Sequence, residues 1–216
     1  RKVFERSENS LQTLFKEAKY FITGTNLLAS NKSSEALLFL VEYASKSGVS
    51  IVIDANWREI FWDKFDKSSQ IQKQDHIQKI KKFLLNGDIL KLSNEEAILF
   101  FGNNNPLLIS QSLSKKPDVI ITNGDKPISW FINGFQDTTK VLKSSRIVDT
   151  TGAGDSFLAG LISRFINRKE DFDKDSLINH IQFASVCGLI SCLGEGAIQP
   201  QPNINQVQDF LKLYGS

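Results

Sequence analysis

Hydrophobic and polar positions follow two different periods along most of the chain. Apolar residues recur at helical spacing in the stretches 11–19, 33–47, 70–85, 95–101 and 106–114. Between them lie short, continuous apolar runs of the kind that form buried strands, at 20–23, 49–53, 88–92 and 118–122. Because helices and strands alternate, the pattern predicts an α/β fold with a mostly parallel central sheet and helices on both faces.

The pattern changes after residue 127. An apolar run at 128–132, the turn Asn133-Gly134 and a polar return strand predict a β-hairpin over 128–141. From Asp155 onward the spacing is mostly helical. Since the chain has no internal repeat and no low-complexity linker, it predicts a single domain over residues 1–216.

Composition narrows the classes of function. The 216 residues are 41% hydrophobic and 23% charged, so a chain of this length buries roughly 70% of its unfolded surface without needing disulfides or metals. The net charge is +2 and the basic residues are scattered, which argues against a nucleic-acid partner. No apolar run reaches the ~18 residues of a membrane span. We therefore expect no membrane partner.

Two cysteines bear on the cellular compartment. Cys187 and Cys192 lie in one apolar stretch, and their spacing matches neither a zinc pair nor a redox motif. We expect both to be reduced core residues. The chain shows no signal-like N-terminus, so a cytoplasmic location is expected.

The segment 147–161 carries the clearest chemistry. The apolar pair Ile147-Val148 leads into a loop of small residues that ends in Gly152-Ala153-Gly154 and opens into an amphipathic helix. Backbone N–H groups at a helix N-terminus, unobstructed by side chains, form an anion site. The P-loop pattern G-x-x-x-x-G-K-[ST] is absent, which excludes an ordinary P-loop kinase.

Asp155 follows this loop directly, and the residues alone leave two interpretations of it open. It is either an ordinary acidic residue of a helix's first turn, favoured by the helix dipole, or a general base that takes a proton from a hydroxyl attacking a γ-phosphorus.

The string DTTGAGDSFLAG, residues 149–160, resembles the second signature of the ribokinase-like (phosphofructokinase-B) sugar kinases. The resemblance implies a three-layer ribokinase-like sandwich and ATP as phosphoryl donor. It also implies that Gly152, Ala153 and Gly154 form the anion hole and that Asp155 is the catalytic base in contact with the substrate. Asp149 and Thr151 resemble the positions that hold a monovalent cation, which would be K⁺.

Two further segments resemble the family in the same order. Residues 54–62, DANWREIFW, are similar to the D-x-N-x-R-x-x-x-W stretch of fructokinase-like members, which implies that Asn56 and Arg58 bind substrate. Residues 91–97, KLSNEEA, are similar to the N-x-x-E element, which implies that Glu96 organises Mg²⁺ through water, with Ser93 at the asparagine position. For Glu96 the alternative of a plain first-turn residue stays open.

The nucleotide side is implied by two more segments. Residues 120–126, IITNGDK, resemble a nucleotide-binding strand end. Pro127 follows them, where members of the family usually carry glycine. Residues 183–185 and 194–197 resemble the two ends of the adenine-side helix and the loop that follows it, with plain core and helix-stop sequence as the open alternative. The ATP-binding residues implied are Thr122, Gly124, Gly152, Gly154 and Ser185.

The resemblance implies phosphorylation of a sugar hydroxyl by Mg-ATP, with fructose preferred because of the 54–62 stretch and Ser93. A kinase for another small alcohol (ribose, a nucleoside or a vitamin) and a non-catalytic relative acting as an interaction module are the alternatives. The family's N-terminal part and lid have no counterpart in these 216 residues, which begin at Arg1 and contain no methionine. We therefore expect this stretch alone to phosphorylate poorly, and we leave a homodimer of the full-length protein open.

Overall fold

The computed structural model describes residues 8–63, 70–166 and 173–214. The chain divides into two compact units, Arg1–Ile120 and Ile121–Ser216. Within the described residues the strands are hydrogen-bonded in chain order, from β1 to β6. The single domain over residues 1–216 stays a prediction.

The first unit is built on parallel strands, which are β1 (Tyr20–Gly24), β2 (Ser50–Asp54) and β3 (Ile89–Ser93). Gly24 lies opposite Asp54, and Asp54 lies opposite Lys91. The carboxyl ends of the three strands therefore meet at one edge, where α/β proteins bind their ligands. The strand β4 (Asp118–Asn123) runs across the boundary between the units.

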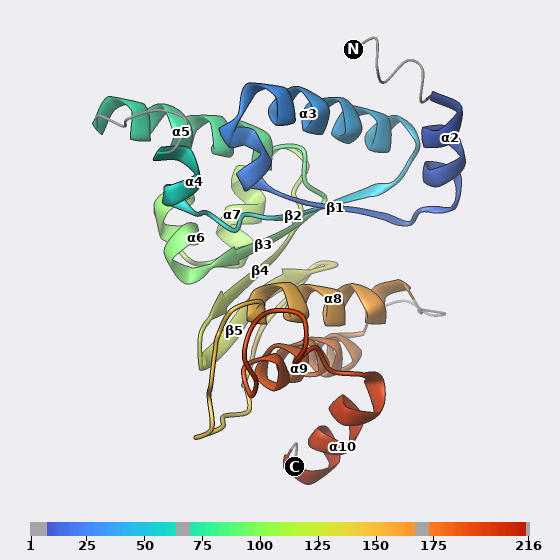
Figure 1. Cartoon of the computed structure of the whole chain (residues 1–216), viewed down its shortest axis with the longest axis vertical. Helices are drawn as coiled ribbons and strands as arrows, with labels where there is room; N and C mark the ends of the chain where they lie inside the picture. The colour runs from blue at the N-terminus through green and yellow to red at the C-terminus, as the bar shows by residue number, and fades with distance from the viewer. Residues whose placement is uncertain (1–7, 64–69, 167–172, 215–216) are drawn as a thin grey trace. The chain divides into compact units, whose positions relative to one another are not determined.

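The helices of the first unit include those predicted from periodicity: α2 (Glu8–Glu17), α3 (Asn31–Lys46), α5 (Gln70–Leu84), α6 (Asn94–Phe101) and α7 (Pro106–Ser112). Helix α3 connects β1 to β2, and α5 leads into β3 (Figure 1). The apolar residues of α3 that face the strands, Leu37, Val41 and Ala44, are buried. The helical period thus marks the core-facing side.

Local signals set the helix ends. The Ser30 hydroxyl accepts a hydrogen bond from the backbone N–H of Ser33 at the start of α3. Asn105 caps α7, whose first residue is Pro106. Two short elements were not predicted, the 3-10 helix η1 (Thr25–Ala29) and helix α4 (Glu59–Asp63). Five residues are too few to display a helical period.

The second unit contains the predicted hairpin. Strands β5 (Lys126–Ile132) and β6 (Phe135–Thr139) pair antiparallel. Their turn places Asn133 at φ 49° and Gly134 at φ 82°, the two positive values that a type I′ turn demands. The hairpin prediction is confirmed.

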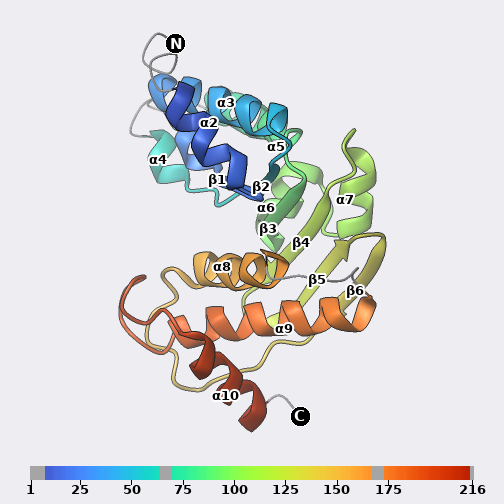
Figure 2. The same ribbon diagram turned by 90° about the vertical axis from the view of Figure 1, so that its right-hand side faces the viewer.

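The hairpin is followed by the helices α8 (Ala153–Ile166), α9 (Lys174–Ser191) and α10 (Ile204–Tyr214). Helix α8 packs along α9, which also contacts β6 and α10 (Figure 2). Cys187 and Cys192 are free and buried, as expected, and burial raises the pKa of Cys187 to about 11. No helix in the described part of the chain is long and apolar enough to cross a membrane.

Candidate functional site

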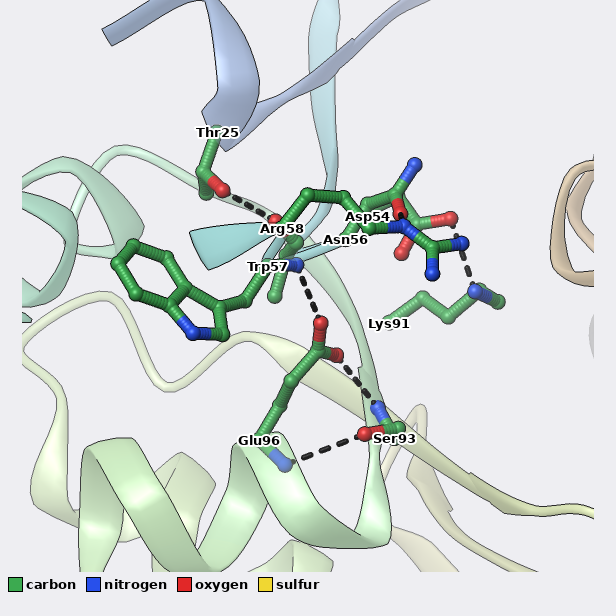
Figure 3. A network of polar contacts seen from close by, with 9 residues as sticks. Thr25, Asp54, Asn56, Trp57, Arg58, Lys91, Ser93 and Glu96 are labelled. Carbon is green, nitrogen blue, oxygen red and sulfur yellow. Dashed lines mark hydrogen bonds and ion pairs between the residues drawn. The ribbon is translucent and has the colours of Figure 1, made fainter. Parts of the chain in front are cut away.

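A buried ion pair joins the carboxyl ends of β2 and β3 in the first unit. Lys91 Nζ lies 2.8 Å from Asp54 Oδ2, and the two side chains are only 7% and 9% exposed (Figure 3). The two residues are direct register partners on neighbouring strands. Removing both charges from water is costly, and their contact offsets part of that cost.

The chain immediately after β2 is held by backbone bonds. The N–H of Ala55 donates to the Lys91 carbonyl over 3.0 Å, and the Thr25 hydroxyl donates to the Ala55 carbonyl. The N–H of Trp57 donates to Glu96 Oε1 over 2.5 Å (Figure 3). These hydrogen bonds therefore fix the backbone conformation of residues 55–57.

The fixed loop presents Asn56 and Arg58, the predicted substrate residues. Asn56 adopts the left-handed region at φ 40°, an uncommon conformation that asparagine tolerates better than most residues. Arg58 is exposed, and its Nε donates to Asn56 Oδ1 over 3.2 Å. The two side chains thus lie together and offer amide and guanidinium donors to an oxygen-rich ligand.

Glu96 closes the N-terminus of α6. Its Oε2 accepts from the Ser93 N–H over 2.7 Å, while the Ser93 hydroxyl accepts from the Glu96 N–H over 3.1 Å, a complete capping box. Its other oxygen holds the Trp57 N–H. A carboxylate offers about four acceptor sites, so Glu96 still fits a hydrated Mg²⁺ through water. The geometry is therefore compatible both with a first-turn capping role for Glu96 and with a role in organising Mg²⁺ through water.

Replacing Glu96 by glutamine tests the capping role. The amide keeps one acceptor oxygen, and its NH₂ faces either the Ser93 or the Trp57 N–H. A buried donor without its partner costs ~1–3 kcal/mol. We expect this loss in chemical denaturation of Glu96→Gln. The exposed neighbour Glu95 is the matched control, and Glu95→Gln should stay within about 0.5 kcal/mol of wild type; equal effects of the two changes would contradict the capping role.

The same residue gives stability a pH dependence. Burial is the main cause that raises the pKa of Glu96, and the N–H bonds from Ser93 and Trp57 oppose it. A carboxyl whose folded pKa exceeds its unfolded pKa stabilises the fold below the unfolded value, and that contribution is lost as pH rises through the folded value. We expect wild type to show this decline in the free energy of unfolding and Glu96→Gln to lack it.

In the second unit, the small-residue loop depends on Gly152. Its φ is 80°, a conformation that favours glycine. A Cβ at this position would lie 2.8 Å from the Cβ of Ala197 and 3.0 Å from its Cα. The loop before α8 and the turn at Ala197 therefore approach each other more closely than any side chain at 152 allows.

Asp149 ties these two segments together. Its Oδ1 accepts from the Thr151 N–H over 2.9 Å and from the Thr151 hydroxyl over 2.7 Å, and its Oδ2 accepts from the Gly196 N–H over 3.0 Å. The Thr151 N–H is the main cause that lowers the pKa of Asp149. An ionised carboxylate beside a hydroxyl suits a monovalent cation, so the predicted role of Asp149 and Thr151 stays compatible with the geometry.

The first turn of α8 supplies the anion donors. The Ala153 N–H donates to the Thr150 carbonyl over 3.2 Å and is therefore partly used within the turn. The N–H groups of Gly154 and Asp155 lie in the first turn, where a helix provides no carbonyl four residues earlier. Asp155 itself is exposed. The helix begins two residues before Asp155, so Ala153 and Gly154 belong to the helix as well as to the predicted anion hole.

The three other predicted nucleotide residues lie apart in sequence. Thr122 is near the end of β4, and Gly124, at φ 56°, opens the turn into β5. Ser185 lies within α9, where its hydroxyl donates to the Gln182 carbonyl over 2.8 Å. Across residues 8–63, 70–166 and 173–214, His, Cys, Asp and Glu side chains nowhere gather in threes to hold a metal ion.

Lys91 has no role predicted from the sequence. A lysine inside the apolar run Ile89–Leu92 was the available signal, because lysine is almost never fully buried without a partner. That signal does not name Asp54, since the pairing depends on the register of two strands 37 residues apart.

Comparisons with known proteins identify the family of the chain. The family model described as pfkB family carbohydrate kinase matches residues 2–204. The chain belongs to the pfkB family of carbohydrate kinases.

Among curated relatives of this pfkB family chain, "Probable fructokinase-6, chloroplastic" of Arabidopsis thaliana is 27% identical over 203 residues, which cover 92% of this chain and 50% of that protein. Fructokinase-1 of Zea mays is 26% identical over 203 residues, covering 92% and 60%. An uncharacterized sugar kinase of Dictyostelium discoideum is 40% identical over 83 residues, covering 38% and 22%. The chain thus spans 50% of the Arabidopsis fructokinase and 60% of the maize fructokinase.

Solved structures show the fold. A fructokinase from Xylella fastidiosa with bound ATP superposes with a TM-score of 0.81 at 19% identity, covering 94% of this chain and 64% of that one. A fructokinase from Vibrio cholerae O395, solved with fructose, ADP and calcium ion, superposes with a TM-score of 0.76 at 22% identity, covering 90% and 61%. The predicted ribokinase-like α/β fold, with its mostly parallel sheet, is confirmed.

Proposed function

We propose that the full-length protein transfers the γ-phosphoryl group of ATP to a sugar hydroxyl, with fructose as the preferred acceptor. The observation that carries the proposal is the position of Asp155, exposed on the first turn of α8 directly after the Gly152 turn. A carboxylate next to an anion site is electrostatically unfavourable unless it takes part in the chemistry. Family membership supplies the class of reaction.

In this proposal Asp155 accepts the proton of the acceptor hydroxyl as the hydroxyl oxygen attacks the γ-phosphorus, while the bond from that phosphorus to the bridging oxygen of ADP breaks and ADP leaves. The N–H groups of the Gly152–Gly154 turn and first helical turn stabilise the negative charge on the transferring group, aided by the positive end of the helix dipole. Mg²⁺, when bound, offsets phosphate charge, and Glu96 holds its water ligands.

The remaining residues take the roles that their positions favour. Asn56 and Arg58 bind the acceptor, while Thr122, Gly124 and Ser185 line the nucleotide side. Asp149 and Thr151 hold K⁺. Related structures support these assignments by class, since one was solved with fructose, ADP and calcium ion and a double mutant of the same enzyme with potassium ion. A cytoplasmic location and a homodimer complete the proposal.

An acceptor panel tests the substrate. The full-length gene product is incubated with Mg-ATP and, in separate reactions, with fructose, ribose, adenosine and a vitamin alcohol, and kcat/KM is measured for each. We expect fructose to give the highest value. A higher kcat/KM for ribose or adenosine would replace fructose as the acceptor.

The magnesium role of Glu96 has its own test. Glu96→Gln is expected to raise the Mg²⁺ concentration needed for half-maximal activity and to lower turnover, because a neutral amide holds the hydration shell of a divalent cation less strongly. Mg²⁺ titrations of Glu96→Gln and of Glu95→Gln are compared at saturating ATP. If both variants match wild type, Glu96 has the capping role alone.

A further inference from the structure

The last turns of α9 contact the phosphate loop, residues 148–154, which comprises the small-residue loop and the first helical residues before Asp155. A Cβ on Gly188 would lie 2.9 Å from the carbonyl oxygen of Ala153 and 3.6 Å from the Cβ of Phe157. Gly188 is not among the residues with positive φ, so its helical backbone does not itself require glycine. Glycine inside a helix is unfavourable relative to alanine. The close approach to Ala153 is therefore the physical reason for glycine at this position.

The same part of α9 is attached to the loop on its exit side. The buried Ser156 hydroxyl donates to the Cys187 carbonyl over 3.0 Å, which joins the first turn of α8 to the residue before Gly188. The contacts at Ala153 and Ser156 flank Gly154 and Asp155 in the sequence. A shift of α8 relative to this turn therefore moves the anion donors and the carboxylate together.

The entry side of the loop is attached as well. The carbonyl of Cys192, at the C-terminal end of α9, accepts from the Val148 N–H over 2.8 Å and from the Asp149 N–H over 3.3 Å. The Gly188 carbonyl accepts from the Ser191 hydroxyl over 2.8 Å and so stiffens this end of the helix. Both sides of the loop thus rest on residues 187–192.

We propose that Gly188 is a positioning residue of the phosphate loop. With no side chain at 188, Ala153 seats against α9 at the depth that places the N–H groups of Gly154 and Asp155 and the Asp155 carboxylate around the transferring phosphoryl group. A methyl group at 188 meets a backbone carbonyl, and no side-chain rotation relieves that contact. The inference rests on the proposed function, because it assigns Gly188 to the same site.

Gly160 provides a matched control on the same helix pair. A Cβ there would lie 2.7 Å from Cys187 Sγ and 3.1 Å from its Cβ, so alanine overpacks the contact between α8 and α9 just as it does at Gly188. Gly160 lies about two helical turns beyond the loop. The shortest contact of its added Cβ is with the Cys187 Sγ, which Cys187→Ala removes, whereas the contact with the Ala184 Cα at 3.2 Å remains. Both alanine variants therefore add a methyl group between α8 and α9. Only the methyl group at position 188 contacts Ala153.

The experiment uses the full-length gene product and compares Gly188→Ala with Gly160→Ala. We expect both to lower the melting temperature by about 2–10 °C. Adding Cys187→Ala should restore part of this loss in Gly160→Ala and none of it in Gly188→Ala. Gly188→Ala is expected to lower kcat by ~10- to 100-fold, because a displacement of about 1 Å at a reacting centre costs up to ~10²-fold. Gly160→Ala should keep kcat within about threefold. Equal kcat losses in the two variants would overturn the inference.

The kcat of Ser156→Ala and the affinity for ADP also test the positioning role of Gly188. Ser156→Ala removes the bond to Cys187 without adding volume, so if Gly188→Ala does not fold, a kcat loss of about threefold or more in Ser156→Ala supports the inference and an unchanged kcat overturns it. ADP affinity by calorimetry separates the inference from the proposed function. If wild type binds ADP but transfers no phosphate, the proposed function fails, and weaker ADP binding in Gly188→Ala than in Gly160→Ala still supports the positioning role, whereas equal binding overturns it.

Discussion

Replacing Asp155 by asparagine is expected to lower phosphoryl transfer by ~10²–10⁴-fold, the usual contribution of a general base. Asparagine has nearly the same shape and keeps the first turn of α8 intact, but its amide does not accept the proton of an acceptor hydroxyl. ATP affinity should stay within a few-fold, because the change removes a proton acceptor and leaves the loop N–H groups in place. Steady-state kinetics at saturating fructose and ATP, with nucleotide affinity measured by calorimetry, check both values.

Asp175 is the matched control for this change. It is likewise an acidic residue in the first turn of a helix, α9, where its charge complements the helix dipole. Asp175→Asn should leave turnover within about twofold of wild type. A loss of less than about tenfold in Asp155→Asn would return Asp155 to the role of an ordinary first-turn residue.

Replacing Lys91 by methionine is expected to lower the free energy of unfolding by ~3–5 kcal/mol, the cost of removing one partner from a buried ion pair. Methionine fills a similar volume but leaves Asp54, 9% exposed in its side chain, without its Lys91 contact at 2.8 Å. The Ala55–Trp57 segment after β2 should loosen as a result. Urea unfolding followed by tryptophan fluorescence measures the loss, since Trp57 belongs to this segment.

An exposed ion pair of the same unit gives the comparison. Lys46 and Glu42 lie 2.6 Å apart on α3 with side chains 73% and 65% exposed, and a pair of this kind contributes only ~0–1 kcal/mol. Lys46→Met should therefore have little effect. The double variant Asp54→Asn/Lys91→Met should recover part of the stability, because it removes the buried charge too. If Lys91→Met costs no more than Lys46→Met, the buried pair has no special role in holding the loop.

The long elements of the fold follow from sequence because each displays its own period. The alternation over Ser33–Ser47 and Val49–Ile53 corresponds to α3 and β2 within two residues. The hairpin follows from Asn133-Gly134, whose side-chain chemistry fits positive φ. The short helices η1 and α4 lie outside this reasoning, since neither completes two turns.

The candidate site is predictable only where local sequence determines it. Small residues before an amphipathic helix predict the Gly152–Asp155 turn. The Ser93–Glu96 capping box is predictable from the spacing of its motif. The contacts that hold these segments are not local. Gly152 faces Ala197 across 45 residues of chain, and such a close approach of two turns depends on tertiary packing, which periodicity does not encode.

The stoichiometry of phosphoryl transfer by the full-length protein tests the proposed sugar kinase activity most directly. Purified wild type is incubated with [γ-³²P]ATP, Mg²⁺ and fructose, and both ADP and labelled sugar phosphate are measured over time. Sugar kinase activity predicts one sugar phosphate for each ADP formed, with formation reduced at least ~10²-fold by Asp155→Asn. Binding of ATP without labelled product from fructose or from any alcohol of the panel would contradict it and would favour a non-catalytic, interaction role for this pfkB family chain.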